Sequence, residues 1–89
     1  MFFVFDLDGT LANIEHRRHF LLREPKDHHA FFAACDADLP NAPVIAALKA
    51  HLAALHRVEI WSGRSDEVRT QTMAWLSAQG IDPRLLTHM

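Results

Sequence analysis

Four apolar residues, Phe2 to Phe5, run directly into the tetrapeptide Asp6-Leu7-Asp8-Gly9. A continuous apolar run of this length is typical of a strand covered on both faces of a parallel sheet. Residues two apart in a strand point to the same side, so Asp6 and Asp8 would both lie at one edge of the sheet. Two like charges there repel each other, which favours a chemical role over a structural one. One carboxylate can act as a nucleophile or metal ligand while the other carries protons.

The composition limits what this chain can be. Its 89 residues make one small domain, and 49% hydrophobic and 22% charged residues are ordinary for a globular protein. The net charge of −2 argues against nonspecific nucleic-acid binding, but it leaves room for a strand end at a local basic site. A single cysteine, Cys35, excludes an internal disulfide and predicts a cytoplasmic protein. No apolar run is long enough to span a membrane, and the run at the N-terminus is too short for a secretory signal.

The hydrophobic pattern predicts strands alternating with helices. Asn41 is the expected cap of the central helix, which carries apolar residues at helical spacing as far as Leu55, and Ser65 is the expected cap of the next helix. The order β-α-β-α-β indicates an α/β fold with right-handed parallel crossovers, in which ligands bind beyond the carboxyl ends of the strands. The expected strands are residues 2–6, 57–62 and 85–87, and the expected helices lie in 14–37 (two pieces separated by Pro25), 41–55 and 65–79.

Two motifs resemble those of a known superfamily. Asp6-Leu7-Asp8-Gly9-Thr10-Leu11 after an apolar strand resembles the first motif of the haloacid dehalogenase (HAD) superfamily, and the segment 58–64, ending in Ser62-Gly63-Arg64, resembles the second. The string from Ile60 to Asp66 is similar to the 3′-phosphatase domain of phage-type polynucleotide kinases, as are the segments 13–18 and 31–32. His28 departs from that pattern, where a tryptophan is expected. The resemblance implies a three-layer Rossmann-like core with a parallel sheet. Residues 1–89 would form only part of such a domain, with about three strands and a helical insert at 14–37.

The resemblance also implies a set of roles. The superfamily consists mostly of Mg²⁺-dependent phosphatases with an aspartate nucleophile, which corresponds to Asp6, while Asp8 corresponds to the acid and base. Mg²⁺ would lie between the Asp6 carboxylate and the Asp8 backbone carbonyl. Thr10 would hold the turn through its hydroxyl. Ser62, the Gly63 N–H group and Arg64 would bind phosphate oxygens, the arginine bidentately.

Two groups of residues keep open interpretations. Arg17 and Arg18 of the insert would either contact substrate or form a solvated helix face. The seven histidines include His16 and His19 at a spacing that suits Zn²⁺ on a helix, but no matching cysteine or carboxylate set accompanies them, which favours surface histidines.

The HAD pattern also requires a lysine in a third motif and acids in a fourth, and neither is found after Leu86. The chain is therefore expected to be a fragment, a truncated product or one part of an assembly. Two functions stand. The first is an Mg²⁺-dependent phosphomonoester hydrolase, a polynucleotide 3′-phosphatase or a nucleotidase, acting on a phosphorylated small molecule or a nucleic-acid 3′ end. The second is a catalytically incomplete module that binds phosphate or a protein. In either case the apolar strand 2–6 would form a sheet edge through which the chain self-associates.

Overall fold

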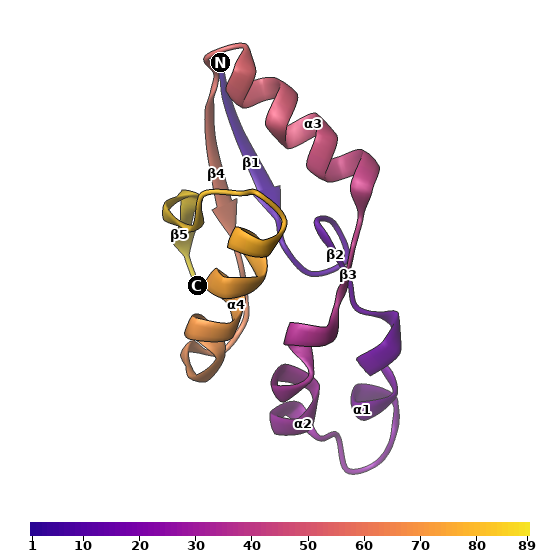
Figure 1. Ribbon diagram of the computed structural model, residues 1–89. Coiled ribbons are helices and arrows are strands. Elements are labelled where there is room, and N and C mark those ends of the chain that lie inside the picture. Colours follow the sequence, from indigo (N-terminus) through magenta and orange to yellow (C-terminus); the bar gives the residue numbers. More distant parts are fainter.

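The computed structural model describes all 89 residues and contains two small sheets with helices between the strands (Figure 1). The larger sheet is parallel, with strand order β1-β4-β5, and the smaller is an antiparallel pair, β2 with β3. This arrangement confirms the expected α/β fold. The strands are β1 (Phe2–Asp6), β2 (Ala12–Asn13), β3 (Leu39–Pro40), β4 (Arg57–Trp61) and β5 (Leu86–His88), and the α-helices are α1 (His19–Leu22), α2 (His28–Ala33), α3 (Ala42–Ala53) and α4 (Arg69–Ala78).

The three strands of the parallel sheet lie within one residue of the bounds that the sequence predicts. β1 and β4 pair in register from Phe2 with Arg57 to Asp6 with Trp61, so both strands end at the same edge. Ser62 follows directly, and its backbone N–H donates to the carbonyl of His88 at 2.8 Å. Burial alternates along β1, with Phe3 and Phe5 half-buried and their neighbours exposed. The strand is therefore covered on one face, although its continuous apolar run predicted cover on both.

One hydrophobic core binds the sheet to both long helices. It joins Val58 and Ile60 of β4 to Leu48 of α3 and Leu76 of α4, and Phe3 and Phe5 pack against it. Because neighbouring residues of paired strands point to the same side, the residues of the opposite side are those at positions 2, 4 and 6 of β1 and 57, 59 and 61 of β4. None of these six belongs to the core, and all but Glu59 are exposed. The helices α3 and α4 thus cover one face and leave the other open.

The ends of the helices differ from the predictions in detail. Asn41 precedes α3, but its side chain makes no capping hydrogen bond. Leu55 lies beyond the helix with a φ of 63°, in the left-handed region that reverses the chain toward β4. The residue is 92% exposed. The helical spacing of Leu55 in the sequence therefore did not predict its burial. Ser65 accepts a hydrogen bond from the Glu67 N–H at 3.3 Å, and a 3₁₀ turn, η3 (Asp66–Val68), comes before α4.

The expected insert is a separate lobe below the sheet (Figure 1). It contains α1 and α2 together with the 3₁₀ turns η1 (Glu15–Arg17) and η2 (Cys35–Ala37), and Pro25 lies between the two helices as predicted. The short pair β2–β3, which the sequence did not reveal, closes the base of the lobe. The lobe lengthens the molecule, whose extents are 45 × 23 × 21 Å. None of the helices has both the length and the apolar character that crossing a membrane would require.

Candidate active site

The two motifs meet at the carboxyl edge of the sheet. Asp6 ends β1 beside Trp61, and Arg64 reaches back to Asp8 with hydrogen bonds of 2.9 Å from Nε and 2.7 Å from Nη2. Gly9 makes the turn between the motif's acids and the rest of the loop possible, because its φ of +80° is one that residues with a Cβ rarely adopt. The backbone N–H groups of residues 10 to 12 all donate to the Leu7 carbonyl, which fixes the loop.

Asp6 has the freer carboxylate of the two acids. The residue is exposed, and its only hydrogen bond is from the Leu7 N–H to Oδ1 at 3.2 Å. No cation lies within salt-bridge distance of it. A carboxylate at a strand end without a charged partner keeps its oxygens available to a ligand, which is what a nucleophile or metal ligand requires.

One oxygen of the Asp8 carboxylate is hydrogen-bonded to the protein, and the other is free. Its Oδ1 atom accepts hydrogen bonds from Arg17 Nη2 at 2.9 Å and from Arg64 Nε and Nη2, whereas Oδ2 accepts none. The side chain is 25% exposed, and no buried polar atom of the molecule lacks a partner, so Oδ2 faces the opening. The two guanidinium groups fix the direction of this acid without occupying the oxygen that faces solvent.

A third acid, Asp38, completes a buried ion cluster with the two arginines. Its carboxylate accepts bonds of 2.8 Å from both Nε and Nη2 of Arg17, and one of 2.9 Å from Arg64 Nη2. His16 lies 2.6 Å from the same group. The backbone carbonyl of Asp38 accepts a bond from Trp75 Nε1 at 2.8 Å, which ties the residue that follows the insert to α4. Asp38 lies one residue beyond the predicted insert, and neither periodicity nor spacing singled it out.

Both arginines are buried, although arginine is usually exposed. Burial opposes the charge of Arg17, but its hydrogen bonds to Asp38 and the nearby Asp8 raise the pKa of the guanidinium overall. Arg17 also donates to the Phe31 carbonyl at 3.1 Å, and Arg64 donates to Thr72 Oγ1 at 3.0 Å. All three nitrogens of the Arg64 guanidinium therefore donate hydrogen bonds within the protein. No pair of N–H groups is left free for the bidentate phosphate contact that the sequence predicted.

The remaining predicted residues divide into two sets. Arg18 is exposed and pairs with Glu15 at 3.1 Å, so in this structure it forms a solvated helix face while Arg17 does not. The Thr10 hydroxyl makes no hydrogen bond, and this residue holds the turn through its backbone N–H alone. Ser62 Oγ accepts from the Arg64 N–H at 3.0 Å and keeps its own proton to donate. The Gly63 N–H donates to no protein group, and the space around its Cα is open.

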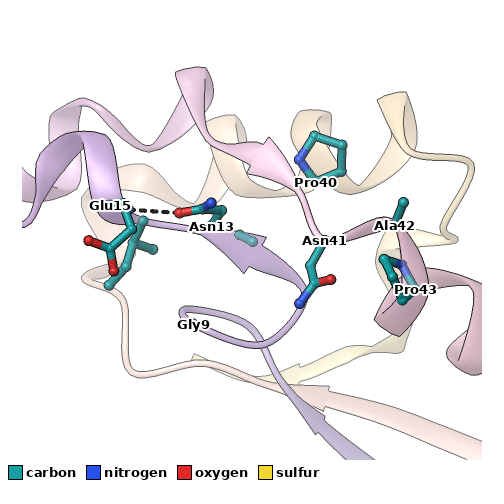
Figure 2. A pocket seen from close by; sticks show the side chains of 9 residues that line it. Gly9, Asn13, Glu15, Pro40, Asn41, Ala42 and Pro43 are labelled. Carbon is teal, nitrogen blue, oxygen red and sulfur yellow. Dashed lines mark hydrogen bonds between the residues drawn. The ribbon is translucent and has the colours of Figure 1, made fainter.

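A cleft of about 590 Å³ opens beside the first motif (Figure 2). Of the motif residues only Gly9 lines it, together with the chain around β2 and the first residues of α3. The side chain of Asn13 is turned back to accept a bond from the Glu15 N–H at 2.9 Å, as Figure 2 shows. The cleft is next to the two acids but does not contain them, so it is a neighbour of the candidate site and not the site itself.

A family of phosphatase domains matches almost the whole chain. The family model described as the polynucleotide kinase PNKP phosphatase domain covers residues 1–84. The chain belongs to this family. It is also similar to a chain in a solved structure titled "Structure of Pnkp1/Rnl/Hen1 complex", with 29% identity and a TM-score of 0.68. That match covers 98% of the present chain and 25% of the solved one, so the present chain spans about a quarter of its relative. No curated protein sequence matches the chain.

Proposed function

We propose that this chain carries the nucleophile and the acid of a Mg²⁺-dependent phosphomonoester hydrolase, with residues 1–89 forming a partial HAD domain and 14–37 its insert. The observation that carries the proposal is the contrast between the two carboxylates. Asp6 is exposed and free of cations, while Asp8 is anchored through Oδ1 by two buried arginines with Oδ2 open to solvent. One acid is arranged to react and the other to exchange protons in a fixed direction.

The chemistry follows from this arrangement. An Asp6 oxygen attacks phosphorus, the bond from phosphorus to the leaving oxygen breaks, and Asp8 Oδ2 gives that oxygen a proton. In the second half, Asp8 takes a proton from water, the water oxygen bonds to phosphorus, and the bond to Asp6 breaks to release phosphate. The Ser62 hydroxyl and the Gly63 N–H are the unengaged donors for the phosphoryl oxygens. Arg17 and Arg64 act as positioning residues for Asp8.

The donor set suits Mg²⁺. No three His, Cys, Asp or Glu side chains gather as a metal site. Mg²⁺, however, usually takes one or two carboxylates and completes its shell with water and substrate phosphate. The Asp6 carboxylate is free, and the Asp8 carbonyl oxygen accepts no backbone hydrogen bond. These two oxygens would hold the ion, which when bound neutralises the charge of the phosphate.

We infer that the substrate is a nucleic-acid 3′ end or a small phosphorylated molecule, because the family model is that of a polynucleotide kinase phosphatase domain. Neither lysine lies at the site. Lys49 Nζ donates to the Gln79 carbonyl at 2.7 Å, and Lys26 precedes α2 in the insert. We therefore expect these 89 residues alone to turn over substrate slowly, if at all, and a phosphate-binding module is the second candidate. The single free, buried Cys35 supports the prediction of a cytoplasmic protein.

The test is release of phosphate from a 3′-phosphorylated oligonucleotide with Mg²⁺, measured for the 89-residue chain and for any longer natural polypeptide that contains it. Asp6→Asn should remove nearly all turnover, because an amide is not a nucleophile. Asp66→Asn is the matched control, since Asp66 is exposed and pairs only with Arg69. Undiminished turnover in Asp6→Asn would refute the assigned nucleophile. If these polypeptides bind phosphate but none of them hydrolyses the substrate, the second candidate, a phosphate-binding module, is the correct one.

A further inference from the structure

An aromatic side chain stands next to Asp6 on the open face of the sheet. Trp61 is the register partner of Asp6, and paired residues of neighbouring strands point to the same side. Neither α3 nor α4 covers that side, and 42% of Trp61 is exposed. Paired strands lie about 4.8 Å apart, so the indole ring starts within one strand spacing of the proposed nucleophile.

The ring is held in a fixed orientation. Its Nε1 donates to Glu59 Oε1 at 3.1 Å, and Glu59 is 8% exposed although no helix covers it. The carboxylate also accepts bonds of 2.6 Å from Thr87 Oγ1 and from Arg57 Nη2. The His88 ring lies 4.6 Å from the indole, tilted by 57°. A buried, fully bonded acid thus anchors the polar edge of the indole while much of the ring remains accessible.

We propose that Trp61 is a stacking platform for the nucleobase of the nucleotide whose phosphate is bound at Asp6. This proposal rests on the proposed function and narrows its substrate class to phosphomonoesters that carry a planar ring. Aromatic side chains beside a phosphate site bind bases through their faces, independently of sequence, at about 1–3 kcal/mol per base. Tryptophan offers the largest face, and anchoring its N–H beforehand reduces the entropy lost on stacking.

The position of Trp61 favours a base over a protein partner. The other exposed apolar residues of this face, Phe2 and Val4, lie further back along β1 from the site. Phe2 is already covered on one side by the Arg57 guanidinium, 4.8 Å from its ring centre. Only Trp61 combines exposure, a fixed ring and a place beside Asp6.

The test compares three probes by titration calorimetry with the 89-residue chain in Mg²⁺ buffer: inorganic phosphate, glycerol 2-phosphate and thymidine 3′-monophosphate. The chain should bind the nucleotide about 5- to 150-fold more tightly than glycerol 2-phosphate, as expected for one stacked base. Trp61→Ala should abolish this preference and leave phosphate binding unchanged, whereas Trp61→Phe should retain most of it. Phe2→Ala is the matched control, an exposed aromatic on the same face but at the far end of the strand, and it should change nothing.

The failures are distinguishable. If none of the three probes binds, the proposed phosphate site itself fails. If phosphate binds but the nucleotide binds no more tightly than glycerol 2-phosphate, only the stacking proposal fails. Equal losses for all three probes in both Trp61 variants would assign the ring a structural role instead. A fall in molecular mass by light scattering in Trp61→Ala, with no change in nucleotide preference, would assign it to an interface between copies.

Discussion

Arg17 and Arg64 donate hydrogen bonds to the same atom, Oδ1 of Asp8, at 2.9 and 2.7 Å. One arginine comes from the insert and the other from the loop after β4, and Asp38 binds both. Two positive and two negative groups thus share one largely buried cluster in which every nitrogen and oxygen that is buried has a partner. Such clusters contribute little net stability when complete, but they are costly to break, because the charge left behind stays buried.

Asp38→Asn should therefore destabilise the domain strongly. The amide removes the negative charge that both arginines face, and breaking a buried ion pair typically costs about 3–5 kcal/mol. Urea unfolding followed by circular dichroism measures the loss. Asp36→Asn is the control, because Asp36 is exposed and forms no ion pair, and it should change the free energy of unfolding by less than about 0.5 kcal/mol. A loss below about 1 kcal/mol for Asp38→Asn would contradict the assigned cluster.

Glu59 should make stability depend on pH in the acid range. The hydrogen bonds from Thr87, Trp61 and Arg57 lower the pKa of its carboxyl from 4.5 to about 2. The folded state thus binds the proton less readily than the unfolded state. The resulting stabilisation is complete above pH 4.5 and is lost as the pH falls toward about 2.

This dependence can be isolated with one substitution. Glu59→Gln should flatten the fall of the unfolding free energy across that pH window, while Glu67→Gln, at an exposed position, should leave the curve unchanged. Parallel curves for the protein and Glu59→Gln would show that Glu59 carries no shifted pKa.

Leu55→Gly should stabilise the protein. Leu55 adopts a φ of 63°, a conformation that costs a residue with a Cβ about 1–2 kcal/mol, and its side chain is almost fully exposed. Part of this gain is offset because glycine makes the unfolded chain more flexible, so we expect a net gain of about 0.5–1 kcal/mol in thermal or urea unfolding. Ala54→Gly, at a φ of −82°, should lower stability instead. Destabilisation by both substitutions would show that the left-handed turn is not strained.

Self-association through β1 stays a prediction that the structure makes more specific. β1 is an edge of the sheet, its outer row of backbone groups has no partner strand, and Phe2 and Val4 are exposed. An apolar edge whose one charged residue, Asp6, lies at its end favours pairing with the same segment of a second copy about a two-fold axis. Light scattering at tens of micromolar should give a dimer mass. Val4→Lys should give a monomer, Thr70→Lys on α4 should not, and a monomer in the unmodified chain would contradict the prediction.

The parallel strands and long helices were predictable because local patterns encode them. The run from Phe2 to Phe5 predicted β1 with its observed bounds, and the segment from Arg57 predicted β4 to within one residue. The pair of motifs also predicted that Asp6, Asp8 and Ser62 come together at one edge. Strand ends, apolar runs and glycine turns are properties of neighbouring residues, so one sequence is enough to indicate them.

The burial of charge was not predictable in the same way. Arg17 and Arg18 are adjacent and chemically identical in the sequence, yet one is fully buried and the other exposed. What separates them is Asp38, whose distance from Arg17 along the chain gives no local signal. The pairing of β2 with β3, which brings Asp38 beneath the site, involves only two residues in each strand. Such short strands leave no periodicity to detect.

The hydrogen bond from Trp75 to the Asp38 carbonyl links the helical lobe to the core of the protein. Asp38 is clamped to α4 through its backbone and to both arginines through its side chain. A tilt of the helical lobe would therefore turn the Asp8 carboxylate, since Arg17 moves with the lobe and Arg64 with the core. The lobe is therefore part of the frame that orients Asp8, and the direction of that carboxylate depends on how the lobe is seated against the core.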